Sequence, residues 1–173
     1  MKLEDTKDIA APRTVVWEAI LNPEVLKTCI PGCQELTGSV EDGFEAVVIQ
    51  KVGPVKATFK GQVTLSDIKV SESLLLTGEG KGGPAGFAKG AAKVSFADTD
   101  EGGTRLTYDV EAKVGGKLAQ LGSRIIDGFT KKLADQFFER FQDGLEEPVE
   151  TENADEDEDE EKPKKGWLKR MFN

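Results

Sequence analysis

The chain has 173 residues, a net charge of −9, no histidine and two cysteines. This length favours one domain, or two at most. The charge is uneven, because residues up to 145 carry 21 acidic and 18 basic side chains, whereas the later residues carry 11 and 5. The part before residue 146 is therefore close to neutral, which argues against nucleic acid as a partner, since such binders present a basic surface.

The N-terminus and the apolar runs bear on localisation. Residues 1–5 are charged and lack the apolar core of a signal peptide. No apolar run approaches the roughly 18 residues of a membrane-spanning helix. We therefore expect a cytoplasmic protein in which Cys29 and Cys33 stay reduced, although their spacing leaves a disulfide open. A structural metal site is not expected, because it would need two further cysteine or histidine ligands.

The first third of the chain predicts one strand and two short helices. Residues 2–9 have the pattern of a strand, and residues 14–21 that of a short helix that Asn22-Pro23 ends. Residues 24–28 predict a second short helix, and Pro31-Gly32 predicts a turn.

The middle of the chain shows a repeated period of two. Apolar residues recur at every second position in residues 44–48, 55–65, 92–96 and 106–114, and residues 74–77 predict a further strand. Turn sequences at residues 53–54 and 98–103 separate some of these runs. The pattern predicts an antiparallel sheet with one buried face.

After Gly115-Gly116 the apolar period changes to three or four. The repeating positions are Leu118, Leu121, Ile125, Phe129, Leu133, Phe137, Phe141 and Leu145. They predict one helix of about 28 residues that contains Gly122 and Gly128 and ends before Pro148. Strands segregated from helices indicate the α+β class.

The residues after the helix divide into two parts. Residues 148–163 are mostly acidic and predict a disordered linker, so that residues 1–147 form the domain. Residues 164–173 form a basic and apolar tip. If the tip is helical, one face carries Trp167, Leu168, Met171 and Phe172, and the bases Lys164, Lys165, Lys169 and Arg170 lie mostly elsewhere. Such a tip is typical of a membrane anchor or of a docking peptide for a partner protein, and an inert tail is the third interpretation.

Five sequence segments occur in a characteristic order. They are Cys29-Ile30-Pro31-Gly32-Cys33, Phe59-Lys60-Gly61, Gly78-Glu79-Gly80-Lys81-Gly82, Gly116-Lys117-Leu118-Ala119-Gln120-Leu121-Gly122 and Gln136-Phe137-Phe138. Together, over about residues 1–147, they resemble the carbon monoxide dehydrogenase G-subunit family of the START-like (SRPBCC) superfamily. The resemblance implies a helix-grip fold, in which a curved sheet of six or seven strands surrounds a long C-terminal helix and leaves a cavity between them. It also implies a non-catalytic bacterial protein that accompanies molybdenum-containing carbon monoxide dehydrogenases, with proposed roles in membrane recruitment and quinone carriage.

The apolar faces supply the candidate residues for such a cavity. They are Phe59, Val63, Leu76, Phe87, Phe96, Tyr108, Leu118, Leu121, Ile125, Phe129 and Leu133. Gly61 interrupts one strand's apolar face and would leave a flat slot suited to a quinone or isoprenoid, although close packing of helix on sheet explains it equally well. Tyr108 either packs with its hydroxyl satisfied or donates to a ligand carbonyl. Residues 78–90 form either a plain hairpin or a mobile lid with Phe87 as its tip.

Three functional hypotheses remain. The first is a carrier of a lipophilic molecule, kept by its tail at the inner membrane face or at a molybdenum hydroxylase. The second is a recruitment or assembly factor for that enzyme without a ligand, whose co-purification with the enzyme would depend on Trp167 and Phe172. The third, a cyclase-like enzyme, is disfavoured because the chain lacks histidine. We assign no catalytic residue and no covalent cofactor, and leave the ligand, a quinone or another lipid, unspecified.

Overall fold

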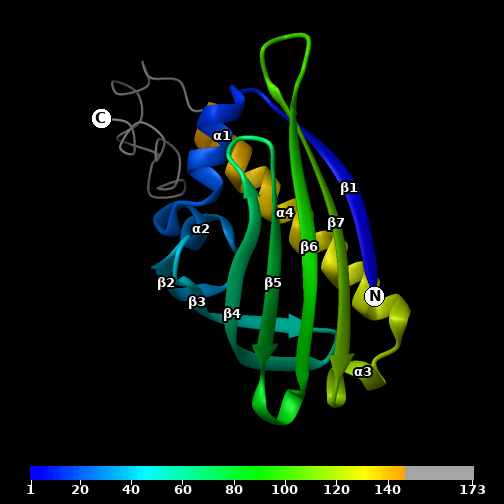
Figure 1. Cartoon of the computed structure of the whole chain (residues 1–173). Helices are drawn as coiled ribbons and strands as arrows, with labels where there is room; N and C mark the ends of the chain where they lie inside the picture. The colour runs from blue at the N-terminus through cyan, green and yellow to red at the C-terminus, as the bar shows by residue number, and fades with distance from the viewer. Residues whose placement is uncertain (147–173) are drawn as a thin grey trace, which may run out of the picture.

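The computed structural model describes residues 1–146, which form a seven-stranded antiparallel sheet with a long helix across one face (Figure 1). In chain order the elements are β1 (Lys2–Ile9), α1 (Arg13–Ile20), α2 (Pro23–Cys29), β2 (Cys33–Ser39), β3 (Gly43–Val52), β4 (Val55–Lys69), β5 (Ser73–Lys81), the 3₁₀ turn η1 (Gly83–Ala85), β6 (Phe87–Asp98), β7 (Thr104–Gly115), α3 (Lys117–Gln120) and α4 (Ser123–Glu146). The predicted α+β class and helix-grip architecture are confirmed. The predicted linker and tip, residues 148–173, lie outside the described residues.

The sheet has the strand order β1-β7-β6-β5-β4-β3-β2. Strands β2 to β7 therefore form one continuous meander, and β1 joins it beside β7. All six predicted strands are present, and β2 is a further one. Strand β4 reaches Lys69 and β5 reaches Lys81, beyond the predicted runs 55–65 and 74–77. We call the face that carries the buried alternate residues, and that α4 covers, the inner face.

Local sequence explains the two short helices. In α2 the Asn22 side chain accepts a hydrogen bond from the Glu24 backbone N–H at 2.9 Å, and Pro23 occupies the first helical position. Helix α1 buries Val16, Trp17 and Ala19 against the sheet. None of the helices within residues 1–146 has both the length and the apolar composition needed to cross a bilayer.

The expected single C-terminal helix is wrong in one respect. Helix α3 ends at Gln120, and α4 begins only at Ser123. Gly122 lies between them with a φ of +92°, which helical backbone does not allow. The apolar spacing continues through this break, because Leu118 and Ile126 belong to the same buried cluster although they lie on different helices. Periodicity alone therefore does not reveal the break, and Gly122 lies outside the helix interior.

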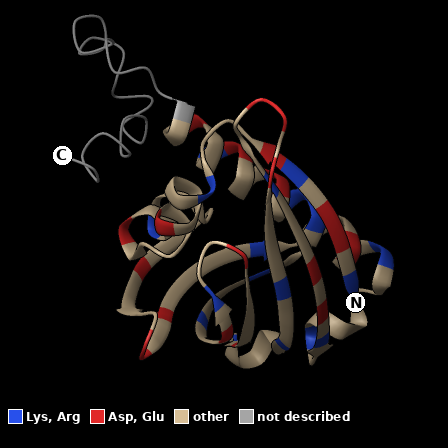
Figure 2. Cartoon of the chain, turned by 45° about the horizontal axis from the view of Figure 1, so that its top comes forward, with Lys and Arg blue, Asp and Glu red and all other residues tan. Residues whose placement is uncertain are grey.

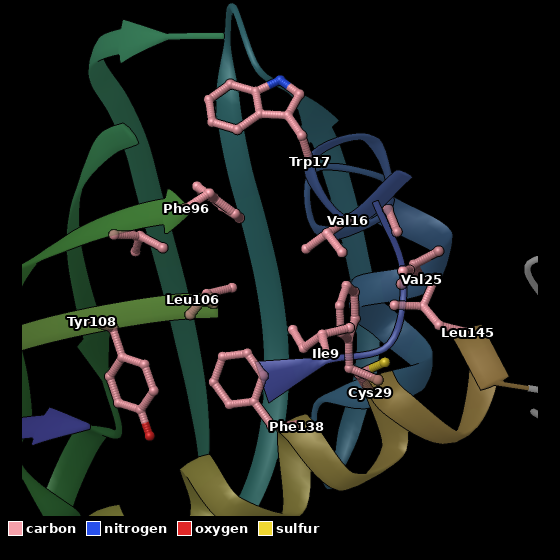
Figure 3. Packing of buried hydrophobic residues seen from close by; sticks show 14 of the residues in the cluster. Ile9, Val16, Trp17, Val25, Cys29, Phe96, Leu106, Tyr108, Phe138 and Leu145 are labelled. Carbon is pink, nitrogen blue, oxygen red and sulfur yellow. The ribbon is translucent and has the colours of Figure 1, made fainter. Parts of the chain in front are cut away.

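Two separate clusters of buried side chains hold α4 against the sheet. The first, shown in part in Figure 3, gathers α1, α2, one end of the sheet and the C-terminal half of α4; its buried members are Ile9, Ala11, Val16, Trp17, Ala19, Val25, Cys29, Leu74, Val94, Phe96, Leu106, Tyr108, Phe138, Phe141 and Leu145. The second lies at the other end and contains Val52, Leu118 and Ile126, with Phe59 and Phe129 among the partly buried residues packed on it. The two clusters therefore pack α4 on the sheet at two separate places.

Alanine substitutions of Gly122 and Gly128 should change the free energy of unfolding in opposite directions. We expect Gly122→Ala to destabilise the protein by about 1 kcal/mol or more, because its φ of +92° disfavours a side chain. We expect Gly128→Ala, inside α4 where an added Cβ meets nothing within 4 Å, to stabilise it by about 0.5–1 kcal/mol. Urea unfolding of both variants measures this. Equal signs for the two substitutions would contradict the broken helix.

Candidate functional site

Small residues form a band across the middle of the inner face. The strand register places Ala46, Gly61, Gly80 and Ala88 side by side on four strands. The adjacent inner row places Gly78, Gly90 and Ala112 side by side. We call these seven residues the small-residue belt. All seven are half-buried, whereas the sheet residues of the two clusters beyond the belt are larger.

Open space lies over the centre of the belt. A Cβ atom added to Gly80 would meet no atom within 4 Å, and one added to Gly61 would meet only backbone oxygens at 3.8 and 4.0 Å. No side chain of α4 therefore makes van der Waals contact at these two positions. Gly90 is small for a different reason, because a Cβ there would clash with the backbone of β7. Glycine at position 90 thus permits the close approach of strands, and glycine at 61 and 80 leaves room.

The residues predicted to line a cavity fall into three groups. Phe96, Tyr108 and Leu118 are buried members of the clusters, and Leu76 packs against the first cluster. Phe59, Leu121 and Phe129 are partly buried against the second cluster and so lie at one end of the belt. Val63 and Leu133 are partly buried and belong to neither cluster. Among the residues predicted to line a cavity, the second and third groups are therefore the better candidates for contact with the open space.

Two predicted residues lie elsewhere. Phe87 occupies the alternate position to Ala88 on β6, so it faces the outer side of the sheet, where it is 40% exposed and packs across Gly115. The expectation that Phe87 is the tip of a lid over the cavity is therefore wrong in its placement. The inward side chains of β6 are those at even-numbered positions, as the apolar residues of the run 92–96 indicate, and position 87 is odd. Ile125 is 41% exposed and lies beside Gly53 at the β3–β4 turn. Residues 78–90 form the predicted hairpin, with η1 at its turn.

A hollow of about 730 Å³ lies on the outer side of the sheet, and three belt residues, Gly78, Gly90 and Ala112, also line it. Its lining includes the outward side chains of Gln62, Thr77, Lys89 and Glu111. Charged and hydroxyl groups of this kind suit a polar ligand and disfavour an apolar one. We therefore do not assign this hollow to a lipophilic molecule.

Tyr108 has a buried hydroxyl without a partner. The residue is 5% exposed, and its ring stacks on Phe138 with ring centres 5.3 Å apart. Within the described part of the chain, its hydroxyl oxygen is the buried side-chain polar atom that lacks a hydrogen bond. Burial, followed by the negative charge of Asp5, raises the pKa of this hydroxyl, so Tyr108 is a neutral donor. The hydroxyl is therefore not satisfied by other described residues, contrary to one of the two sequence interpretations.

A cluster of four charges that the sequence interpretation missed joins β1 to α4. Lys7 donates to Asp135 at 2.8 Å, and Lys131 lies 3.3 Å from the other oxygen of Asp135. Asp5 lies 3.6 Å from Lys7 and 3.8 Å from Lys131. The hydrogen bond from Lys7 lowers the pKa of Asp135, and the same bond raises the pKa of Lys7. These pairs fasten the sheet edge to the helix beside Tyr108 (Figure 2 shows the charges).

Cys29 and Cys33 are not joined in a disulfide. Cys29 is buried in the first cluster, and Cys33 at the start of β2 donates to the Glu35 carbonyl at 3.3 Å. Burial raises the pKa of the Cys33 thiol, which disfavours a reactive thiolate. Among residues 1–146 no three His, Cys, Asp or Glu side chains gather in a way that could hold a metal ion.

Sequence and structure comparisons place this domain in a known family. The model of the carbon monoxide dehydrogenase G-subunit (CoxG) family matches residues 6–146. The chain belongs to this family. The CoxG family comprises accessory subunits that are not known as catalysts, and the matched range covers nearly all of the described domain. A search of curated proteins returned no match.

Solved structures support the same assignment. A conserved protein from Geobacillus kaustophilus is similar at 30% identity and a TM-score of 0.77, over 82% of this chain and 93% of that one. Protein Ms6760 from Mycobacterium smegmatis is 18% identical with a TM-score of 0.57, over 79% and 85% of the two chains. A protein from Rhizobium leguminosarum is 18% identical with a TM-score of 0.57, over 79% and 91%. The last two show the fold alone.

Removing the carboxylate of Asp135 should weaken the fastening between β1 and α4. We expect Asp135→Asn to lower the free energy of unfolding at pH 7 by no more than about 1 kcal/mol, because the pair is partly exposed. The folded pKa of Asp135 lies below its ordinary value of 3.8, so the wild-type advantage persists down to about pH 4 and disappears as the pH falls further. Because the pKa of Lys7 is raised above 10.5, the advantage is also lost at still higher pH.

Chemical denaturation of both proteins from pH 2 to pH 11 checks this profile. A difference between the two proteins that stays constant below pH 3 would show that the carboxylate of Asp135 acts through packing rather than through its charge.

Proposed function

We propose that this protein is a non-catalytic carrier that holds a lipophilic molecule, a quinone or similar isoprenoid, between the small-residue belt and α4. The observation that supports the proposal is the open space over Gly61 and Gly80, since Gly61 lies on β4 between Phe59 of the second cluster and Leu65 of the first. Protein interiors are otherwise closely packed, and an apolar space of this kind is typical of a ligand site.

The surface around this space fits a flat apolar ring. Glycine and alanine on adjacent strands present backbone and methyl groups rather than long side chains, so a ring can lie close to the sheet. The side chains of Phe59 and Phe129 lie at one end, where both are partly buried. The Tyr108 hydroxyl, two inward positions along β7 from the belt residue Ala112, is a neutral donor without a partner, and a ligand carbonyl that reached it would satisfy it.

Family membership supports a role beside a redox enzyme. The family takes its name from carbon monoxide dehydrogenase, and we propose that this chain associates with a molybdenum enzyme of that type. The carrier would receive or deliver the quinone that accepts electrons from such an enzyme. The tip, residues 164–173, would keep it close to the inner membrane face or to the enzyme, because it combines bases with Trp167 and Phe172.

Filling the belt should block ligand loading without harming the fold. We expect Gly80→Leu to reduce quinone loading by about tenfold or more, which corresponds to roughly 1.4 kcal/mol, because the new side chain occupies the space. Thr77→Leu, on the outer side of the same strand, is the matched control and should load like the wild type. The measurement incubates each protein with quinone-bearing phospholipid vesicles, re-isolates the protein and quantifies quinone in its organic extract.

The stability of each variant decides how the loading result is interpreted. Gly80→Leu should unfold no more easily than the wild type, because its Cβ meets no atom. Equal loading of a folded Gly80→Leu variant would place the ligand elsewhere. Absence of loading in all three proteins would favour the second candidate, a recruitment factor without a ligand.

A further inference from the structure

The turn between β4 and β5 presents apolar side chains to solvent. Val70 is 70% exposed, the highest value among the large apolar residues that the structure describes, and Ile68 is 40% exposed. The turn is also held in an unusual conformation, because Asp67 and Ser71 have φ values of 50° and 63°. Left-handed backbone is disfavoured for such residues, so the turn needs outside support.

That support comes from α1. The Arg13 side chain donates to the Ser71 carbonyl at 3.0 Å and to the Asp98 carboxylate at 2.8 Å. The backbone N–H of Phe96 donates to the Glu72 carbonyl at 2.8 Å. The turn is therefore fixed against α1 and the end of β6 while its two apolar side chains stay uncovered. Apolar groups held in this way mark an interaction surface.

Acidic residues lie at the same end of the sheet as these apolar groups. Asp67 and Glu72 flank them on the turn, and Asp98, Asp100 and Glu101 lie on the neighbouring β6–β7 turn, which is red at the top of Figure 2. A hollow of about 550 Å³ between the two turns is lined by Glu72, Phe96 and Asp98, and also by Arg13, Lys69 and Lys93. We call Ile68, Val70 and the five acidic residues the turn surface. Despite the three bases, it combines apolar groups with an excess of carboxylates.

The chain carries a segment with the complementary character. Residues 164–173 contain four bases, Lys164, Lys165, Lys169 and Arg170, together with the apolar side chains Trp167, Leu168, Met171 and Phe172. We propose that this segment binds the turn surface of its own chain, with its apolar side chains over Ile68 and Val70 and its bases beside the carboxylates. This goes beyond the carrier role, because it gives the tip a resting site from which a membrane or enzyme must displace it.

The position of the end of α4 makes this contact accessible. Leu145 packs into the same cluster as Trp17 and Phe96, so the described chain ends beside α1, at the same end of the molecule as the turn surface (Figures 1 and 3). The 17 residues 147–163 give a root-mean-square reach of about 20–25 Å if they behave as a flexible chain. The lysine-rich opposite end, near Lys117, lies about 36 Å further along α4. The turn surface thus lies at the same end of the molecule as the start of the tether.

Tethering also favours the tip of the same chain over that of a second copy. A short flexible tether gives an effective concentration in the millimolar range, far above the micromolar concentrations of a purified protein. The contact should therefore not depend on protein concentration.

Nuclear magnetic resonance of the full chain tests the proposal through the indole N–H of Trp167. The chain has two tryptophans, and Trp167→Phe identifies which indole signal belongs to the tip. We expect the Trp167 signal in the wild type to be shifted from its position in a free peptide of residues 162–173. It should return to that position in the double variant Ile68→Ser and Val70→Ser. The matched control, Ile49→Ser with Phe87→Ser, removes apolar groups that are 38% and 40% exposed elsewhere and should keep the wild-type shift.

Three results would overturn the proposal. A wild-type Trp167 signal at the free-peptide position would show that the tip is unbound. A shift that survives in the Ile68 and Val70 variant would place the tip on another surface. A shift that changes with protein concentration would indicate a contact between copies. Each of these leaves the ligand-loading experiment unaffected, so failure here is distinguishable from failure of the carrier role.

Discussion

Two clusters of large side chains, one toward each end of α4, hold this helix on the sheet. At one end Trp17, Phe96, Tyr108, Phe138 and Phe141 fill the first cluster, and at the other end Val52, Leu118 and Ile126 form the second. A helix of 24 residues is about 36 Å long and too stiff to bend into a hollow between two such supports. The small residues between the supports therefore stay half-buried, and the space above Gly61 and Gly80 follows from this arrangement rather than from a defect in packing.

The polar contacts reinforce the same arrangement at the sheet edge. The four charges of Asp5, Lys7, Lys131 and Asp135 join β1 to α4 beside the first cluster. They lie next to Tyr108, a member of the first cluster whose hydroxyl is buried without a partner. A buried donor without a partner costs about 1–3 kcal/mol, so a protein retains one only where something compensates. A ligand carbonyl is the compensation that the carrier role supplies.

Much of the fold was predictable from the sequence, because strands and helices impose different apolar periods. The alternation at 55–65 and 106–114 predicted β4 and β7, and Asn22-Pro23 predicted where α1 ends. The break at Gly122 was not predictable from periodicity, because Leu121 and Ile125, on the two sides of it, keep the helical spacing of four. A positive φ at one glycine leaves no trace in the spacing of its apolar neighbours.

The candidate site was less predictable, since it depends on register between strands. Gly61 stands out alone in the sequence, but only the pairing of β3, β4, β5 and β6 shows that Ala46, Gly80 and Ala88 extend the same row. The position of Phe87 in β6 likewise places its side chain on the outer face of the sheet, which the sequence interpretation did not predict. The charge cluster could have been predicted from the sequence pattern. Asp5 and Lys7 lie at odd-numbered positions of β1, as do the inward residues Leu3 and Ile9. Lys131 and Asp135 are four residues apart on the helix. Charges at inward positions indicate partners on the covering helix.

The most direct test of the carrier account is mass spectrometry of an organic extract of the protein, purified without detergent from its own host. The account predicts a quinone or other isoprenoid at close to one molecule per chain. A blank extract, repeated after incubation of the same protein with quinone-bearing vesicles, would contradict it and leave recruitment of the enzyme as the function.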